Sequence, residues 1–297
     1  MGIEVFIQHF INGVSLGGLY ALIAIGYTMV YGILRLINFA HGDIFMMASY
    51  FVIFSMVTFG LPWFISIIVV ILITVLLGVL IERTAYKPLR DAPRMSIMIS
   101  AIGVSFLLEN LATYLFTGVP KGFPDLPALT RIVSAGSISF PVVSFVIPVV
   151  TLILLLILLY IVNHTKIGMA MRAVSEDFET AKLMGVKIDF VVGITFTIGS
   201  ALAAVGAILW GTKYPSVYPL MGVMPGLKCF IAAVFGGIGN IKGAVLGGGI
   251  LGISESMLVA FLPNLTGYRD AFAFILLIVV LLVKPSGLLG ERTTEKV

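Results

Sequence analysis

Charged residues are scarce in this chain of 297 residues, and cysteine is nearly missing. Asp, Glu, Lys and Arg together make up 11% of the sequence, whereas an average soluble domain carries about 25%. Hydrophobic residues make up 60%, and a soluble domain could not bury so much apolar side chain behind a polar surface. The single cysteine, Cys229, excludes an internal disulfide and leaves no cysteine cluster for a metal. The composition therefore indicates a membrane protein without a structural metal site.

Motifs of nucleotide binding and of metal-dependent hydrolysis are also missing. The chain contains no Gly-x-x-x-x-Gly-Lys-Ser/Thr for phosphate and no His-Glu-x-x-His for zinc. Its histidines, His9, His41 and His164, are not at ligand spacing. No basic tract with interleaved aromatic residues is present, so nucleic acid is not an expected partner. We expect this chain to be neither an enzyme nor the carrier of a cofactor, and any energy from ATP has to come from a partner.

Long apolar runs recur along the chain, and several have the roughly 20 residues needed to cross a hydrocarbon core about 30 Å thick. The predicted membrane-crossing helices are 6–34, 36–59, 62–82, 95–117, 141–163, 191–211, 244–262 and 269–284. The first run is expected to be a retained span, because no basic residue precedes it. Residues 226–238 form a shorter stretch, which we interpret as a half-helix or re-entrant segment. The prediction is an all-α, polytopic protein of the lipid bilayer in which residues 1–297 form one transmembrane domain.

Two long hydrophilic segments separate the apolar runs. Residues 118–140 are rich in proline and glycine and predict an irregular external loop. Residues 164–190 carry charges at helix-like spacing, and the Lys and Arg residues of this segment and of 83–94 place both in the cytoplasm. This orientation puts the N-terminus outside, unless residues 5–34 contain a re-entrant turn.

A short helix is expected within the second hydrophilic segment, over residues 176–184. Ser175 is a suitable N-cap, and Gly185 offers the left-handed residue that ends a helix. Glu176 and Asp177 then lie at the positive end of the helix dipole. The expected contact face consists of Phe178, Ala181 and Met184. Such a helix indicates a docking element for a partner, and the alternative is a helix that lies on lipid headgroups.

Glycine is abundant and regularly placed. A spacing of four residues joins Gly13 to Gly17 and Gly248 to Gly252, and such stripes let a second helix approach closely in a membrane. The cluster Gly236-Gly237-Ile238-Gly239-Asn240 is dense enough to break a helix. At membrane depth a break is tolerated only where the freed backbone groups are buried in protein or face water. Two interpretations of the cluster remain open, an element of a transport pathway and a tight turn at the membrane surface.

Polar side chains also occur in apolar surroundings. Glu109 and Glu255 fall inside predicted spans, where a charge costs roughly 3 kcal/mol on insertion scales. Each is either the proton or cation site of an ion-coupled transporter or a carboxylate packed against a neighbouring helix. Lys228 lies in the short stretch and could extend to an interface instead. A polar turn, either solvated or capping the next helix, is expected at Asn38, His41 and Asp43.

Several motifs together resemble one transporter family. Residues 18–32, leading into Asn38-Phe39-Ala40-His41-Gly42, look like the N-terminal signature of the permeases of branched-chain amino acid ABC importers. Residues 175–185 resemble the cytoplasmic loop by which that family contacts its ATPase, and 236–244 and 284–290 resemble its two C-terminal signatures. The chain is most similar to the shorter, H-type permease of such systems. Two positions depart from the usual pattern: Lys284 stands where Arg is common, and Asn240 where Ser is common.

The resemblance implies a multi-subunit importer in a bacterial or archaeal cytoplasmic (inner) membrane. The implied partners are a second homologous permease, two cytoplasmic ATP-binding subunits that hold ATP and Mg, and an external substrate-binding protein. The residues implied in ATPase coupling are Glu176, Asp177, Thr180, Ala181 and Gly185. Those implied in the translocation pathway or its gating are Asn38, His41, Gly42, Gly236, Gly237 and Asn240.

Three alternatives to a branched-chain amino acid importer were weighed. A permease of the same family could carry urea, short amides or other amino acids, because selectivity belongs largely to the binding protein. A self-sufficient, ion-coupled transporter would use Glu109 or Glu255 and need no ATPase. A membrane-embedded enzyme would need a nucleophile–base or metal constellation.

Overall fold

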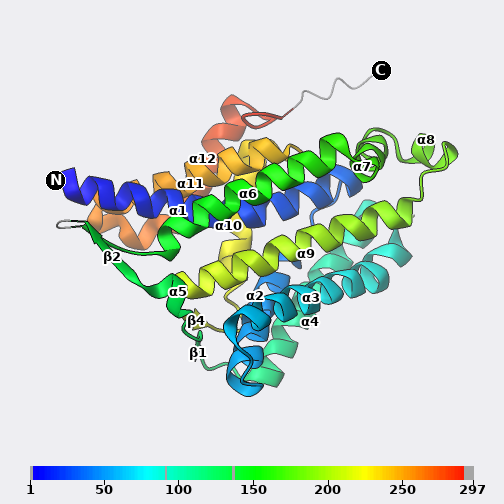
Figure 1. Cartoon of the computed structure of the whole chain (residues 1–297). Coiled ribbons are helices and arrows are strands. Elements are labelled where there is room, and N and C mark those ends of the chain that lie inside the picture. Colours follow the sequence, from blue (N-terminus) through cyan, green and yellow to red (C-terminus); the bar gives the residue numbers. More distant parts are fainter. Residues whose placement is uncertain (1–2, 91, 136–137, 291–297) are drawn as a thin grey trace.

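The computed structural model of the chain describes residues 3–90, 92–135 and 138–290 (Figure 1). The described part is a bundle of helices, and eight helical segments in it are long and apolar enough to cross a membrane. The prediction of an all-α, polytopic membrane protein is therefore confirmed. The long helices are α1 (Ile3–Leu34), α2 (His41–Ile53), α3 (Trp63–Ile81), α4 (Arg94–Phe116), α6 (Val143–His164), α9 (Ile188–Lys213), α11 (Ile241–Phe261) and α12 (Arg269–Val283).

Shorter elements connect and extend these helices. The short helices are η1 (Phe54–Thr58), η2 (Glu82–Tyr86), η3 (Lys87–Leu89), α5 (Pro127–Thr130), α7 (Lys166–Glu176), α8 (Phe178–Leu183), α10 (Val223–Gly236) and η4 (Pro263–Tyr268). The strands are β1 (Lys121–Gly122), β2 (Ile132–Ala135), β3 (Ile138–Pro141) and β4 (Ser216–Val217). β1 pairs antiparallel with β4, and β2 pairs antiparallel with β3. The expectation that 118–140 is irregular is therefore wrong for these strands, and Gly136 lies outside the described residues.

Helix α1 forms the centre of the bundle and is buried along most of its length. It packs against α6, α9, α10 and most extensively α11. The glycine stripes lie at this crossing: a Cβ atom on Gly17 would lie 2.8 Å from the Cα of Gly249, and one on Gly13 would lie 2.9 Å from the Cα of Ile253. Only residues without side chains permit such an approach. The stripes therefore serve helix packing.

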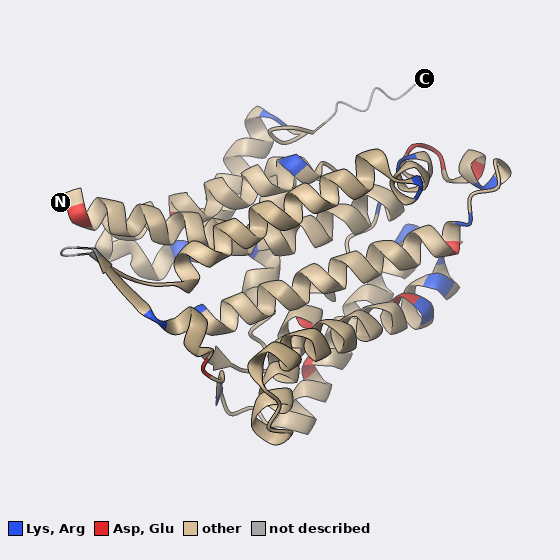
Figure 2. Ribbon diagram, in the orientation of Figure 1, with Lys and Arg blue, Asp and Glu red and all other residues tan. Residues whose placement is uncertain are grey.

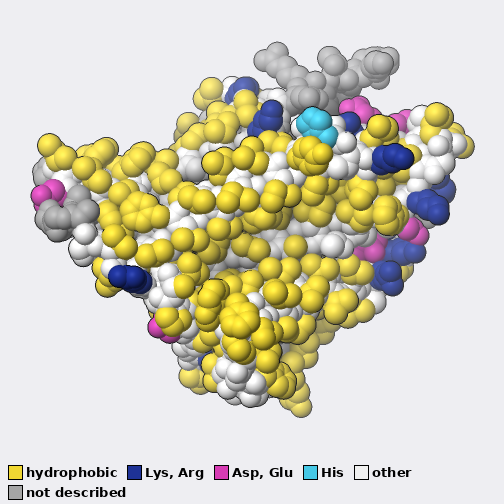
Figure 3. Space-filling view, in the orientation of Figure 1, with side chains coloured by type: hydrophobic (Ala, Val, Ile, Leu, Met, Phe, Trp, Pro, Cys, Tyr) yellow, Lys and Arg dark blue, Asp and Glu magenta, His cyan; other side chains and the backbone are white. Residues whose placement is uncertain are grey.

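The outer helices expose large areas of apolar side chain, which would be unfavourable in water. Ile68, Leu72, Leu76 and Leu80 follow one another at helical spacing along α3, and each is exposed. Figure 3 shows hydrophobic side chains over most of the visible face, with the charged side chains confined largely to its edges. Soluble monomers rarely expose apolar patches of such extent, so these faces match a hydrocarbon environment.

Two helices begin inside the bundle instead of at its ends. α2 begins at His41, whose ring touches Gly26 in the middle of α1. The expected span 36–59 is therefore wrong at its start, because residues 35–40 are not helical and return from the end of α1 into the interior. α10 begins at Val223 after β4 and has only 14 residues, which matches the half-helix expected at 226–238.

The starts of these two helices touch each other. A Cβ atom on Gly42 would lie 2.6 Å from the carbonyl oxygen of Gly222, and the Gly42 Cα also lies close to Gly226. Backbone therefore meets backbone where α2 and α10 begin.

Basic residues gather at one end of the molecule. Most of the Lys and Arg visible in Figure 2 lie at the end that carries α7, α8 and the connection between α3 and α4. The N-terminus lies at the opposite end (Figure 1), and α1 is one continuous helix from Ile3 to Leu34. A re-entrant turn within 5–34 is thereby excluded for the described residues.

Candidate functional site

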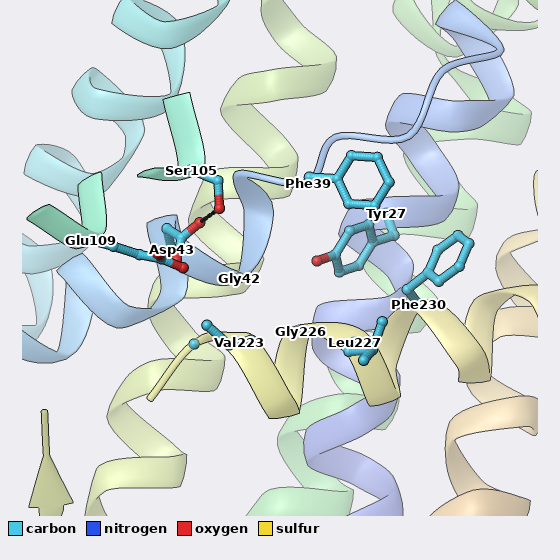
Figure 4. Close-up of a pocket in the computed structure, with 11 residues that line it drawn as sticks. Tyr27, Phe39, Gly42, Asp43, Ser105, Glu109, Val223, Gly226, Leu227 and Phe230 are labelled. Carbon is cyan, nitrogen blue, oxygen red and sulfur yellow. Dashed lines mark hydrogen bonds between the residues drawn. The ribbon is translucent and has the colours of Figure 1, made fainter. Parts of the chain in front are cut away.

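A cavity of about 150 Å³ lies between α2, α4 and α10. Figure 4 shows acidic and hydroxyl side chains on one side of it and aromatic side chains on the other. The lining residues are Tyr27, Phe39, Gly42, Asp43, Ser105, Glu109, Gly222, Val223, Gly226, Leu227 and Phe230. The cavity thus lies at the point where the starts of α2 and α10 meet.

Asp43 occupies the first turn of α2, where the helix dipole favours a carboxylate. The N-cap residue of α2 is Ala40, and no side chain caps the helix. The expectation that this turn caps the next helix through a polar side chain is therefore wrong. The Asp43 carboxylate instead accepts a hydrogen bond from the Ser105 hydroxyl of α4. Asp43 is only 2% exposed although its side chain is an acid.

Ser105 and Glu109 reach the same cavity because they are four residues apart on α4 and so share one face. Glu109 is half-buried and lies beside Asp43 in Figure 4. No Lys or Arg of the described residues forms an ion pair with either carboxylate. These two acids therefore face the cavity without a cationic partner from the described chain.

Asn38 and His41 are buried beside the cavity, so the alternative of a solvated turn is wrong. The Asn38 Oδ1 atom accepts a hydrogen bond of 2.7 Å from the Tyr86 hydroxyl. The His41 ring packs edge-on against Tyr27 at 4.8 Å between centroids. Both residues hold the return segment 35–40 in place and neither lines the cavity, whereas Gly42 does.

Glu255 lies in a second charged cluster, between α1, α10, α11 and α12. The Lys228 ammonium lies 2.9 Å from the Glu255 carboxylate and 2.7 Å from that of Asp270. The Tyr20 hydroxyl donates a hydrogen bond of 3.0 Å to the other Glu255 oxygen. Lys228 is buried and is paired with both the buried Glu255 and the exposed Asp270, so the alternative in which it extends to an interface is wrong.

Gly236, Gly237 and Asn240 lie at the far end of α10, in the tight turn that leads to α11. The Asn240 side chain accepts a hydrogen bond from the Gly243 amide and donates one to the Leu289 carbonyl, both 3.0 Å long. The Leu289 amide donates to the Gly236 carbonyl over 2.8 Å. The two C-terminal motifs of the sequence thus bind each other, and these three residues do not line the cavity.

The hydrophilic segment contains two helices in place of the single helix expected over 176–184. Ser175 is not the cap: it lies in the last turn of α7, and its hydroxyl donates to the Arg172 carbonyl. Asp177 caps α8 instead, because its carboxylate accepts hydrogen bonds of 2.9 and 2.8 Å from the amide and the hydroxyl of Thr180. These bonds hold the pKa of Asp177 below its ordinary value. Gly185 has φ +84° and ends the segment as expected.

The surface of α7 and α8 differs from the expected one at Met184. Glu176, Asp177 and Thr180 are exposed, but Ala181 is buried and supports the helix from beneath. Met184 was expected on the buried face and is 80% exposed, next to Leu183 at 87%. This exposed apolar pair was missed because helical spacing alone does not reveal where a helix ends. The Arg35 guanidinium donates to the Ser175 carbonyl over 2.9 Å, which joins α7 to the return segment 35–40.

Two features bear on enzyme chemistry. Residues 13–17 have the letters of a Gly-x-Ser-x-Gly nucleophile elbow, but that motif requires a strand-to-helix turn. Ser15 instead lies inside α1, and its hydroxyl accepts a hydrogen bond of 2.7 Å from Lys213. Residues 3–90, 92–135 and 138–290 contain no group of three His, Cys, Asp or Glu side chains able to hold a metal ion.

Comparison with known proteins assigns the chain to a family. The family described as "Branched-chain amino acid transport system / permease component" matches residues 9–281. The high-affinity branched-chain amino acid transport system permease protein LivH of Salmonella typhimurium is 43% identical, and LivH of Escherichia coli is 42% identical, each over 98% of both chains. The corresponding protein BraD of Pseudomonas aeruginosa is 40% identical over the same share. The chain therefore belongs to the permease family of branched-chain amino acid transport systems.

Proposed function

We propose that this chain is the transmembrane permease subunit of an ATP-driven importer of branched-chain amino acids. The observation that carries the proposal is the 43% identity to a high-affinity permease of that kind over 98% of both chains. The partners we propose are a second homologous permease, two ATP-binding subunits that hold ATP and Mg, and an external binding protein. Residues 1–297 act as one transmembrane domain in a bacterial or archaeal cytoplasmic membrane.

The basic end of the molecule faces the cytoplasm in this proposal, in keeping with the positive-inside rule. α7 and α8 then form the surface that the ATP-binding subunits contact, through Glu176, Asp177, Thr180, Gly185 and the exposed pair Leu183 and Met184. Ala181 supports this surface from within. The hydrogen bond from Arg35 to Ser175 offers a direct route from α7 to the return segment 35–40.

The translocation pathway lies, in the same proposal, between the two permeases and opens alternately to each side, and the cavity between α2, α4 and α10 forms part of it. Asn38, His41 and Gly42 position the start of α2 beside it. Gly236, Gly237 and Asn240 act as the pivot at the far end of α10, where the backbone of the C-terminal segment holds them.

Uptake of labelled leucine by proteoliposomes that contain the complete importer tests the proposal. Accumulation is expected only when ATP is present on the side of the ATP-binding subunits and the binding protein on the other. Accumulation driven by a proton or sodium gradient without ATPase would replace the importer by an ion-coupled carrier. Uptake of urea or a short amide, but not of leucine, would change the substrate and keep the class of transporter.

The coupling surface has its own test in the variant Glu176→Lys. Glu176 is exposed at the C-terminal end of α7, where a cation suits the helix dipole, so folding should be preserved. ATP hydrolysis is expected to continue while leucine uptake is lost, both measured on the same vesicles. Normal uptake in this variant would show that the segment is not the coupling surface.

A further inference from the structure

We propose, building on the function proposed above, that the cavity between α2, α4 and α10 binds the amino acid in transit, with the substrate ammonium held by Asp43 and Glu109. The cavity is then a substrate site within the permease itself. Its chemistry selects a small zwitterion that has an apolar side chain.

The first argument is the charge that the cavity leaves unmatched. Glu255 has Lys228 within 2.9 Å, and Glu82 has Arg90 as its partner. Asp43 and Glu109 have no ion-pair partner among the described residues. Acidic side chains inside a membrane protein ordinarily pair with a cation or mark a substrate or ion path. An ammonium group placed between α2 and α4 would supply the missing positive charge.

The second argument is the shape and lining of the space. The cavity has a volume of about 150 Å³. One water needs roughly 10–15 Å³ of such volume, so the cavity has room for about ten waters or for a molecule the size of a single amino acid. Tyr27, Phe39 and Phe230 lie across the cavity from the carboxylates (Figure 4), and Leu227 extends the apolar wall. This wall can contact an apolar side chain.

The third argument is the start of α10. Val223, Gly222 and Gly226 line the cavity at the N-terminus of this helix. The amides of Val223 and Gly226 already donate to the carbonyls of Leu220 and Gly222, so this helix start offers an anion the positive end of its dipole. Half-helices inside transporters present their N-termini to substrate carboxylates in this way. The ammonium, the carboxylate and the apolar side chain of an amino acid thus each meet a complementary part of the cavity.

Chemical labelling of the carboxylates tests the site without relying on transport. Proteoliposomes containing the complete importer are treated with a hydrophobic carbodiimide, and modification of Asp43 and Glu109 is followed by peptide mass spectrometry as loss of the free carboxyl. An amide formed when an added amine traps the activated carboxyl therefore counts as modification and not as protection. Leucine is expected to slow the modification, and so is 3-methylbutylamine, which keeps the ammonium and lacks the carboxylate. The hydroxy acid 2-hydroxy-4-methylpentanoate, which lacks the ammonium, is expected to give no protection.

Variants locate the effect. In Asp43→Asn, the leucine concentration that half-protects Glu109 is expected to rise about thirtyfold or more, as for the loss of one partner of a charge pair. The matched control Asp125→Asn removes an exposed carboxylate between β1 and α5 and should leave this concentration unchanged. If Asp43→Asn fails to assemble, the variant Glu109→Gln replaces it. The measured quantity is then the leucine concentration that half-protects Asp43, and the same rise is expected.

Several results would overturn the inference. Equal protection by leucine and by the hydroxy acid would exclude recognition of the ammonium. Protection by sodium ions and not by leucine would make the cavity an inorganic cation site. Leucine uptake by vesicles in which leucine gives no protection would overturn the inference alone. Failure of leucine uptake would overturn the proposed function, and the inference with it.

Discussion

Two groups of acidic and basic side chains lie in or at the edge of the helical bundle, and their carboxylates have different partners. The ion-pair cluster of Lys228, Glu255 and Asp270 has a cation between two carboxylates and a hydrogen bond from Tyr20. The cavity cluster of Asp43, Ser105 and Glu109 has acids and a hydroxyl but no cation from the described residues. The described residues thus supply a cation to the first cluster and none to the second.

The difference separates a structural use of buried charge from a functional one. The ion-pair cluster joins four helices, α1, α10, α11 and α12, so it fixes their relative positions. The cavity cluster joins only α2 and α4 and leaves space between them and α10. Variants of the two clusters should therefore differ in kind, with loss of stability in one and loss of ligand recognition in the other.

The largest effect is expected when the ion-pair cluster loses its cation. Lys228→Met leaves two carboxylates without a partner, and breaking a buried pair in this way costs about 3–5 kcal/mol. Thermal unfolding of the purified permease in detergent measures the loss. The combined variant Lys228→Met, Glu255→Met, Asp270→Asn should recover most of it, because no buried charge is left. An unaltered Tm in Lys228→Met would show that the ion pairs contribute nothing to stability.

A smaller loss of stability is expected where the starts of α2 and α10 meet. In Gly42→Ala the new methyl group would lie 2.6 Å from the Gly222 carbonyl oxygen, and such overpacking costs about 1–3 kcal/mol. Gly103→Ala is the matched control, because nothing lies within 4 Å of a Cβ atom built there. The control should be as stable as the parent or slightly more so. Equal Tm values for both variants would mean that α2 and α10 do not touch.

The cavity cluster should tolerate the loss of a charge. Glu109→Gln removes a carboxylate that no described cation offsets, so the free energy of unfolding should change by no more than about 0.5 kcal/mol. Glu255→Gln is the comparison, and it should destabilise clearly more because Lys228 loses one of its two partners. Thermal unfolding of both variants without leucine measures the difference. A larger loss in Glu109→Gln would assign Glu109 a structural role.

The smallest effect concerns Asp177, a carboxylate in water. Its pKa is lowered by the hydrogen bonds from Thr180, so the cap stabilises α8 above the unfolded value of about 3.9 and is lost as the pH falls through the folded pKa. The α8 amides should lose protection from hydrogen exchange, corrected for intrinsic rates, as the pH falls below the folded pKa of Asp177. Asp177→Ala should show the faster exchange at neutral pH, and equal protection in both proteins would exclude the cap.

Hydropathy predicted the membrane-crossing helices because their outer faces are apolar. α3 and α6 carry no Asp, Glu, Lys or Arg in their apolar runs, so hydropathy alone predicts both helices. The start of α2 was misplaced because residues 35–40 are themselves mostly apolar and do not show that they leave the helix. The break becomes apparent only in the structure, where the backbone of Arg35 has a positive φ of 54° and therefore leaves the helical conformation.

The candidate sites were harder to predict because they depend on contacts between distant residues. Glu109 and Glu255 were both recognised as charges in a span, but the sequence could not tell that one has a lysine partner and the other does not. The sequence predicts Asp43 only as part of a polar turn, because an acid at the start of a helix in water commonly caps that helix or is solvated. Its burial, and its bond to Ser105 across 62 residues, appear only when α2 and α4 are packed.

The contact between Gly42 and Gly222 has a consequence for leakage. Under the proposed pathway, the closest contact in the barrier at this point joins main chain to main chain. Rotamer changes, which occur in picoseconds to nanoseconds, cannot open such a barrier, whereas displacement of a whole helix takes microseconds to milliseconds. Small solutes would therefore be held back between cycles, and the passage would open in step with movements of α2 or α10.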